Sequence, residues 1–559
     1  MNDNVKQMEE IYCTNTDSKV LIPSGMALLD MIAFFGIKNP QTILGACVNN
    51  KVQNLNYRIY SPKTITFLDI NTANGRKMYS LSLMFLTYKA VKNLYPQNEL
   101  FIKHSMNGGY YAEIENIKED ISVVVEHIKK EMKKLVKQNL PFERKILSQQ
   151  EASDLFEKVG ITEKAKLIRN SKRLYANIDI LGETVNSFFF EMVPSTSYLN
   201  IFDLEPFDKG FIILMPDKDK DNKQPETVIN QSKIFSIFQE HKNWVEILGT
   251  PYVTNLNERI IEGKQNELIQ VSEALHEKKY AAIADNIYKK KDNVKLVLLA
   301  GPSSSGKTTS CRRIATQLSV LGIKPLQISL DDYFLDRGHT PKDEKGEYDF
   351  ECLEALDLEY FNYQMNELLK GNEIELPRFN FVVGAREKSK KKIHLTDNSM
   401  IIVEGIHALN PKLSLEINRK NKYFIFVSAL TQVAIDRHNL ISTSDNRLIR
   451  RIVRDYNYRG SSAESTISRW ESVRNGEEKH IFPFQENADS IFNSSLLYEI
   501  GVLKNYCEPL LMDVPQTSPA YANARRLHQF LNNFLTIKPD YIPPTSIMRE
   551  FLGGSSFDY

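Results

Sequence analysis

The sequence has little of what would place it in a membrane or in an oxidising compartment. Its five cysteines lie far apart, are odd in number and form no C-x-x-C pair, which argues against a disulfide framework or a zinc ribbon. Nowhere do eighteen apolar residues follow one another, and residues 1–19 are polar and charged. Neither a membrane span nor a signal peptide is expected, so the cytoplasm is the expected compartment.

An excess of one charge is also missing. Lys and Arg number 71 against 70 Asp and Glu, so no overall field attracts the chain to nucleic acid or to a membrane. The tetrapeptide N-K-x-D, which reads guanine, does not occur, and this weighs against a GTPase. A chain of 559 residues with 42% hydrophobic content is long enough for about three or four domains with ordinary cores.

One stretch carries a specific chemical signal, the segment VKLVLLAGPSSSGKTT at residues 294–309. An apolar strand runs into G-x-x-x-x-G-K-[ST], a loop whose backbone N–H groups cradle phosphates while the lysine reaches the β- and γ-phosphates and the following hydroxyl reaches Mg²⁺. Helical spacing of apolar residues after the loop favours this interpretation over a Gly/Ser linker. The predicted nucleotide-binding residues are Gly301, Ser303, Ser304, Ser305, Gly306, Lys307, Thr308 and Thr309.

Two further apolar runs end in acidic residues. Asp331 and Asp332 follow residues 325–330, and Glu404 follows residues 400–403. In an open parallel sheet the carboxyl ends of the strands form the ligand-binding edge, so Asp331 is expected to accept the proton of an attacking hydroxyl and Glu404 to hold magnesium-bound water. The alternative for the aspartates is an N-cap or a turn.

Four arginines share one predicted helix face, since Arg447, Arg450, Arg451 and Arg454 are spaced i, i+3, i+4 and i+7, with Arg459 just beyond. Like charges four residues apart repel, so this face gains stability when an anion arrives. That suits a lid that closes over ATP. A solvated helix face is the alternative.

These pieces occur together with SLDDYF, YDFECLEALD, VEGIHAL and FPFQENADSIF, and over about 215 residues the block resembles the uridine kinase family with its phosphoribulokinase relatives. The resemblance implies an α/β P-loop kinase domain with a parallel sheet that uses ATP and Mg²⁺. It makes Asp331 the general base on a ribose 5′-hydroxyl. By position it also implies catalytic roles for Lys307 and Arg451, an ATP contact for Arg447, metal contacts for Thr308 and Glu404, and substrate contacts for Asp331, Tyr333, Glu351, Phe379, Arg386 and Arg459.

Two positions depart from that family's pattern. Gly384 stands where relatives that accept uridine or cytidine have a base-reading histidine, and glycine offers no side-chain donor or acceptor. The R-G-R motif that begins at Arg459 is broken by Ser461. The nucleobase therefore stays open.

The front of the chain shows another likeness. IPSGMALLDMIAF and KTITFLDI resemble the ubiquitin-like TGS domain of threonyl-tRNA synthetases, and the residues from Gly75 to about Asp217 resemble their second domain. The H-x-x-x-H pair and the later Cys/His pair of that editing domain are missing, since no histidine precedes His104. One predicted helix of this region carries five lysines, which either contact RNA or form a solvated face, and the solvated face is favoured. They are Lys129, Lys130, Lys133, Lys134 and Lys137.

We therefore expect a flexible tail at 1–19, a small ubiquitin-like α+β domain at 20–72, a second α+β domain at 73–225, a helical connector at 226–290, the kinase-like domain at 291–512, and a C-terminal helix and tail at 513–559. The first functional hypothesis is a nucleoside kinase. The alternatives are a kinase of a sugar phosphate or another small alcohol, and a non-catalytic ATP-binding protein associated with RNA or the ribosome. Self-association stays open.

Overall fold

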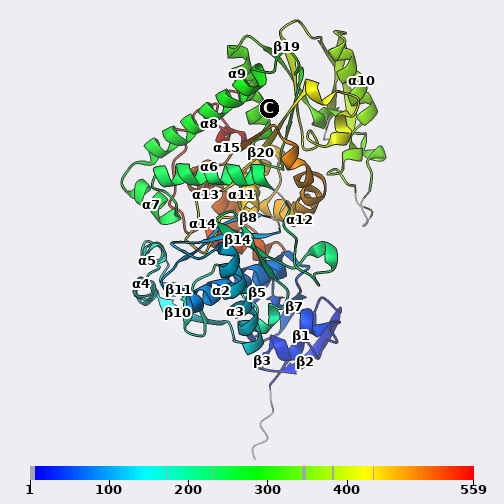
Figure 1. Cartoon of the computed structure of the whole chain (residues 1–559). Helices are drawn as coiled ribbons and strands as arrows, with labels where there is room; N and C mark the ends of the chain where they lie inside the picture. The colour runs from blue at the N-terminus through cyan, green and yellow to red at the C-terminus, as the bar shows by residue number, and fades with distance from the viewer. Residues whose placement is uncertain are drawn as a thin grey trace, which may run out of the picture.

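The computed structural model describes residues 7–558 apart from 107, 172, 230, 343–345, 347, 381, 382 and 432. In Figure 1 the first half of the chain forms a lower lobe, while the connector helices and all that follows form an upper lobe. The upper lobe contains a five-stranded parallel sheet, and the lower lobe contains mixed and antiparallel sheets. The expected α/β class with α+β domains before it is confirmed.

The first domain contains a five-stranded sheet in the order β2-β1-β7-β4-β5. Its elements are β1 Met8–Cys13, β2 Ser18–Pro23, β3 Met26–Ala27, α1 Leu28–Met31, β4 Gly45–Val48, β5 Lys51–Gln53, β6 Arg58–Ile59 and β7 Lys63–Leu68. The expected flexible tail to residue 19 is corrected, because β1 and the start of β2 fall within it. Ile11 and Cys13 are fully buried at alternate positions, a strand pattern that the surrounding charged residues concealed.

The second domain has two sheets, in the orders β13-β14-β9-β8 and β10-β11-β12. Its helices are α2 Ala73–Leu94, α3 Ile121–Gln138, α4 Gln149–Lys158 and α5 Thr162–Arg169. Its strands are β8 Leu100–Met106, β9 Gly109–Ile114, β10 Glu143–Ser148, β11 Tyr175–Leu181, β12 Thr184–Asn186, β13 Asp203–Phe207 and β14 Gly210–Leu214.

Three helices follow and lead into the α/β domain: α6 Ser232–Ile247, α7 Val253–Ile261 and α8 Gln265–Tyr288. The strands of that domain are β15 Leu296–Ala300, β16 Lys324–Ser329, β17 Ile374–Asn380, β18 Ala385–Ile393, β19 Ser399–Glu404, β20 Lys422–Ser428 and β21 Ser490–Asn493. Its helices, with those of the C-terminal segment, are α9 Lys307–Val320, α10 Leu358–Leu369, α11 Thr443–Arg459, α12 Ala463–His480, α13 Glu499–Met512, α14 Tyr521–Leu531 and α15 Met548–Leu552.

The central sheet of the α/β domain has the order β16-β19-β15-β20-β21, and its neighbouring strands are parallel. Its three inner strands are buried almost throughout, because helices cover both faces. All five strands end at one edge of the sheet. The loop after β15, the residues after β16 and the last residue of β19 therefore meet there.

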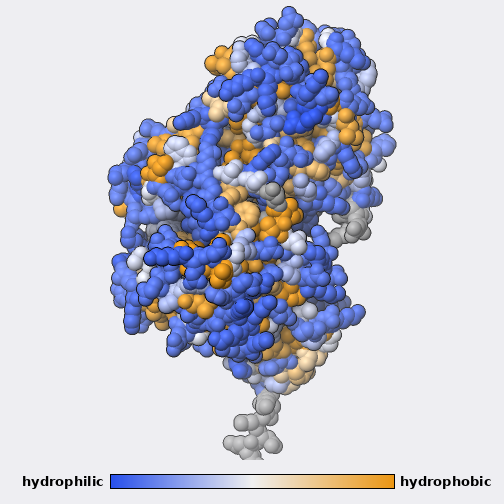
Figure 2. Space-filling model, in the orientation of Figure 1, coloured by the Kyte–Doolittle hydropathy of each residue, from blue (hydrophilic) through white to orange (hydrophobic). Residues whose placement is uncertain are grey.

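The visible surface is largely hydrophilic, with apolar side chains gathered mainly around the junction of the two lobes (Figure 2). Among the described residues, no helix is both long and apolar enough to cross a membrane.

Buried charges join the two lobes. The Nζ of Lys164, on α5, lies 3.3 Å from the Oδ2 of Asp436 in the upper lobe, and both side chains are almost completely buried. Lys164 also donates to the carbonyl of Ser187 at 3.0 Å. Beside this pair, Arg437 forms ion pairs with Glu163 at 2.6 Å and Glu99 at 2.8 Å. These contacts hold the front of the chain against the α/β domain.

Removing one partner of this buried pair is predicted to destabilise the protein strongly. Asp436→Ala leaves the Lys164 ammonium buried without its counter-charge, so the free energy of unfolding should fall by about 3–5 kcal/mol. Urea denaturation measures the loss. Glu10→Ala, which removes an exposed ion pair with Lys19, is the matched control and should cost no more than about 1 kcal/mol. Equal effects of the two substitutions would contradict the prediction.

Candidate active site

The loop between β15 and α9 adopts a tight conformation that includes two residues with left-handed backbone angles. Ser304 and Gly306 have positive φ angles of 57° and 82°. Gly301 leaves no room for a side chain, since a β-carbon there would lie 2.1 Å from the carbonyl oxygen of Val427. Lys307 is the first residue of α9, and its Nζ donates to the carbonyl of Pro302 at 3.2 Å. The loop residues predicted from the sequence therefore lie at the start of α9, where a helix N-terminus favours an anion.

A buried glutamate on α12 braces this loop. Glu477 accepts a hydrogen bond from the Ser303 N–H at 2.9 Å and also accepts from both terminal nitrogens of Arg447. Arg447 is fully buried and donates in addition to the Ser303 carbonyl at 3.1 Å. The expectation that Arg447 contacts ATP phosphates as part of a lid is corrected, because its guanidinium already neutralises a carboxylate beneath the loop.

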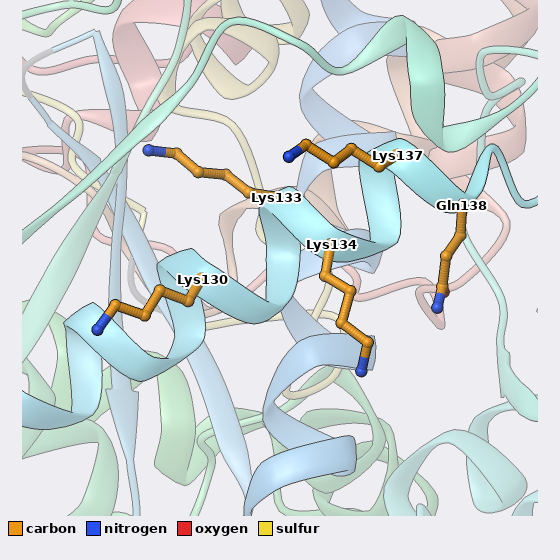
Figure 3. A pocket seen from close by; sticks show the side chains of 5 residues that line it. All are labelled: Lys130, Lys133, Lys134, Lys137 and Gln138. Atoms are coloured by element: carbon orange, nitrogen blue, oxygen red, sulfur yellow. The ribbon is translucent and has the colours of Figure 1, made fainter.

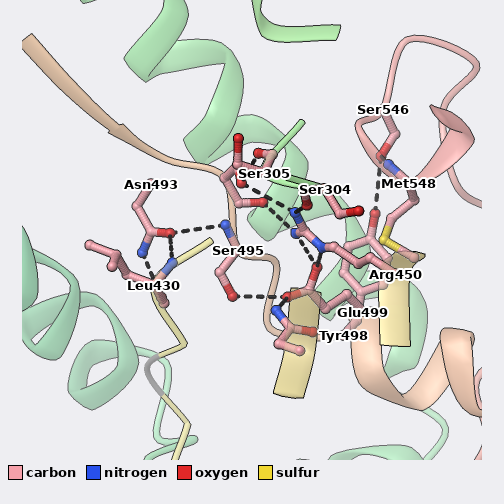
Figure 4. Close-up of polar contacts among 12 residues, drawn as sticks. Ser304, Ser305, Leu430, Arg450, Asn493, Ser495, Tyr498, Glu499, Ser546 and Met548 are labelled. Carbon is pink, nitrogen blue, oxygen red and sulfur yellow. Dashed lines mark hydrogen bonds and ion pairs between the residues drawn. The ribbon is translucent and has the colours of Figure 1, made fainter. Parts of the chain in front are cut away.

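Arg450 has a second arrangement of the same kind, drawn in Figure 4. Its Nε donates to Glu499 at 2.9 Å, and its other nitrogens donate to the carbonyls of Ser304 at 3.3 Å and Ser494 at 2.8 Å. Both charged groups are buried. The predicted alternative of a solvated helix face is therefore wrong for Arg450 and Arg447, which hold the loop from below.

The remaining arginines of α11 lie nearer the open edge. Arg451 donates to the Ser303 hydroxyl at 2.9 Å, and its ion pair with Asp455 is shared with Arg454 and Arg459. Burial raises the pKa of Asp331, and the positive charges of Arg459 and Arg454 oppose this rise, so both arginines lie close to that carboxyl. The predicted arginine cluster is thus divided between a buried pair and an outer group of three.

Three carboxyl groups meet at the carboxyl edge of the sheet. Asp331 follows β16 and remains accessible to solvent, but the protein atoms around it raise its pKa, while Lys307 opposes the rise. Glu404 ends β19, where burial and the charge of Asp331 raise its pKa. Glu351 has its pKa raised to about 7 by burial and by Glu477, against Arg451 and Lys307. The structure therefore brings these predicted acids together around Lys307.

The predicted magnesium ligands suit a divalent cation. The Thr308 hydroxyl donates to Glu404 Oε1 at 3.4 Å, and the Ser329 hydroxyl donates to the same oxygen at 3.3 Å. In the described part of the chain, no three His, Cys, Asp or Glu side chains form a metal-binding group. One carboxylate, one hydroxyl and water are what Mg²⁺ uses beside a nucleotide, and a cation here would relieve the repulsion between Glu404 and Asp331.

The residues predicted to contact the phosphoryl acceptor lie in different surroundings. Tyr333 is corrected, because it is fully buried and its hydroxyl donates to Gln364 at 2.7 Å inside the core. Arg386 forms an ion pair with Asp357 at 3.0 Å. Phe379 is buried with its ring centroid 5.8 Å from that of Phe334.

Sequence reasoning missed several residues of the site. Glu477, on α12, contacts Ser303 of the loop, and Glu499, on α13, contacts Arg450 of α11. Glu550, on α15, contacts Thr309 at the start of α9. No motif surrounds them. A charge balance for the buried arginines is the one signal that could have suggested two of them, because a buried guanidinium needs a carboxylate.

The lysines of α3 do not form a comparable site. Figure 3 shows Lys130, Lys133, Lys134 and Lys137 spreading from the outside of a single helix. All four are exposed, and the lining of this surface hollow comes from α3 alone. Lys129 instead pairs with Asp203. The geometry agrees with the favoured interpretation, a solvated face.

Known proteins resemble this chain chiefly over the α/β domain. Residues 296–497 match the Phosphoribulokinase / Uridine kinase family. A uridine kinase of Bacillus subtilis (strain 168) is 30% identical over 200 residues, which are 36% of this chain and 85% of that protein. A threonine–tRNA ligase of Carboxydothermus hydrogenoformans is 28% identical over 183 residues, 33% of this chain and 29% of that protein. The solved structure of a possible uridine kinase from Bacillus stearothermophilus has 18% identity and a TM-score of 0.27, covering 39% of this chain and 98% of its own.

The parallel sheet, the phosphate loop and the acids at the sheet edge define a P-loop phosphotransferase with an alcohol acceptor. The chain belongs to the phosphoribulokinase/uridine kinase family, through residues 296–497.

The raised pKa of Glu351 predicts how stability depends on pH. The ordinary pKa of an unfolded glutamate is about 4.3, whereas the pKa of Glu351 in the folded protein is about 7. The contribution of the Glu351 carboxyl to the free energy of unfolding is therefore fully present below about pH 4.3 and is lost as the pH rises through 7. Glu351→Gln cannot ionise. Its melting temperature, relative to the unmodified protein, should therefore increase between pH 5 and pH 8. A difference that stays constant over this range would contradict the prediction.

Proposed function

We propose that this protein is an ATP- and Mg²⁺-dependent nucleoside kinase that transfers the γ-phosphate to a 5′-hydroxyl. One observation supports the proposal: Asp331 directly follows β16 at the same edge of the parallel sheet as the phosphate loop, and the charge of Lys307 opposes the burial that raises the pKa of its carboxyl. A carboxylate beside a phosphate-binding loop can receive the proton of an attacking hydroxyl during in-line transfer.

Each remaining group has a task in this reaction. The loop amides and Lys307 bind the triphosphate, while Arg451 and Arg459 neutralise charge that develops on the transferred group. Thr308 would hold Mg²⁺ and Glu404 would hold its bound water, and the ion would supply charge neutralisation of the phosphates. Phosphoryl transfer needs positioning and electrostatic stabilisation more than covalent chemistry, and these residues provide both.

A kinase of a sugar phosphate or another anionic alcohol is the second candidate, and Gly384 favours it. Its φ is 73°, and a β-carbon there would lie 2.8 Å from the Nε of Arg337. A guanidinium therefore lies where relatives that accept pyrimidine nucleosides have the base-reading histidine. Arginine recognises phosphate or carboxylate groups better than it recognises a neutral base edge.

For the front of the chain, we propose a catalytically silent relic of a TGS domain and a synthetase editing domain. The threonine–tRNA ligase similarity supports the origin, and the missing Cys/His set supports the loss of chemistry. The balanced charge and the lysine face of α3 give RNA binding little support. Tight packing against the α/β domain through Lys164 and Asp436 favours a structural role.

Turnover assays test the proposal directly. ADP release should rise when one of the common nucleosides is added with Mg²⁺ and ATP. Asp331→Asn should keep ATP affinity and lower kcat by about 10²- to 10⁴-fold, because only the proton acceptor is lost. Lys307→Ala should instead weaken ATP binding, measured by calorimetry.

Sugar phosphates tested in parallel separate the two candidates. Stimulation by them and by no nucleoside would replace the first candidate with the second. Full turnover by Asp331→Asn would show that Asp331 is not the proton acceptor, whereas no stimulation by any of these alcohols would leave an ATP-binding protein without an acceptor. Asp332→Asn is the matched control, since that neighbouring carboxylate accepts the Phe379 N–H at 3.2 Å and should affect kcat little.

A further inference from the structure

The end of the chain lies on the phosphate loop. Figure 1 shows the C-terminus inside the upper lobe near α9 and β19, far from the front domains. Residues 546–553, here termed the C-terminal strap, contain α15. Ile547 contacts the loop so closely that its Cγ2 is 3.0 Å from where a β-carbon of Gly306 would be. The strap is therefore part of the surroundings of any bound phosphate.

The strap is firmly attached on both sides of Glu550. Ile547, Met548 and Phe551 are fully buried. Asn457 of α11 donates to the carbonyl of Phe551 at 3.0 Å, and the guanidinium of Arg450 lies 5.1 Å from the Phe551 ring centroid. The backbone at Glu550 is thus held in place, whereas its side chain is only half-buried.

Glu550 contacts a residue of the predicted phosphate cradle. Its Oε2 accepts a hydrogen bond from the Thr309 hydroxyl at 2.6 Å and from the Thr309 N–H at 3.4 Å. Thr309 is the third residue of α9, so its N–H is one of the groups that find no acceptor within the helix. In loops of this kind, such N–H groups hold the α- and β-phosphates.

The charge on Glu550 is not neutralised as that of Glu477 is. Glu477 is fully buried and forms ion pairs with Arg447 and Arg474. In the part of the chain that the structure describes, no basic side chain forms an ion pair with Glu550. Its charge contributes to the raised pKa of Glu404, so it adds to the negative potential at the cradle. A polyphosphate that approaches Thr309 meets a carboxylate already there.

We propose that Glu550 is a built-in competitor of the nucleotide: its carboxylate takes the hydrogen bonds of Thr309 that an ATP phosphate needs, and ATP binds only when this side chain rotates away. The inference rests on the proposed ATP binding at this loop. Because the strap keeps the carboxylate beside the site, the competition is intramolecular and independent of protein concentration.

An internal competitor has a characteristic kinetic effect. It raises the Kd and the KM for ATP but leaves kcat at saturating ATP unchanged, because the bound state no longer contains the contact. A hydrogen bond to a charged group corresponds to roughly a tenfold change in affinity. Glu550→Gln and Glu550→Ala should therefore lower the Kd and the KM for ATP by roughly tenfold, with an unchanged kcat.

Calorimetric titration of the full-length protein with ATP and Mg²⁺, together with the turnover assay, tests this. Glu550→Asp keeps the charge but is one methylene too short for Thr309, so it should give an intermediate gain. Asp540→Asn removes an exposed charge upstream of the strap and should change nothing. Melting temperatures establish that each variant is folded, and the conservative Gln and Asp variants serve if Ala disrupts the strap.

The outcomes separate this inference from the proposed function. Tighter ATP binding by the Glu550 variants alone supports the competitor. Unchanged or weaker ATP binding by these variants overturns the competitor, and weaker binding would make Glu550 a contributor to the nucleotide site. In either case the proposed function stays intact if the unmodified protein binds ATP and Lys307→Ala abolishes this binding. If neither the unmodified protein nor the Glu550 variants bind ATP, the proposed function fails and the competitor with it.

Discussion

The backbone N–H groups of the loop and of the first turn of α9, which cannot find acceptors within the helix, are the constraint on which the rest of this domain depends. Such donors concentrate positive potential, and they need an anion. Two side-chain carboxylates meet part of this need, Glu477 at Ser303 and Glu550 at Thr309. Glu477 is neutralised by arginines and is structural, whereas Glu550 takes the hydrogen bonds that the proposed nucleotide would need.

The arginines of α11 follow from the same electrostatics. Four guanidinium groups on one face would repel one another. Here two of them are buried against Glu477 and Glu499, and the outer ones share Asp455. Burying charged pairs is costly unless their groups are hydrogen-bonded, and the loop carbonyls of Ser303 and Ser304 supply further acceptors to Arg447 and Arg450. The helix thereby supports the loop and still presents cations to the open edge.

The front of the chain is connected to this helix through charge as well. Asp445, in the first turn of α11, accepts from Arg526 of α14 at 2.6 and 2.8 Å and lies 3.6 Å from Lys77 of α2. Burial alone would raise the pKa of Asp445, but Arg526 and Lys77 lower it well below its ordinary value. The carboxylate is therefore ionised at neutral pH. It ties the arginine helix to the second domain and to the C-terminal segment at once.

By itself the sequence determined the α/β class, the loop of residues 301–309 and the meeting of Asp331 and Glu404 at one sheet edge, because these follow from local motifs and from apolar runs that end in acids. Only the tertiary structure decided that Tyr333 faces the core, that Arg447 is occupied by Glu477, and that Glu550 reaches Thr309. The physical reason is that burial and pairing of a charge depend on partners supplied by distant segments, 241 residues away for Glu550, and no local pattern encodes them.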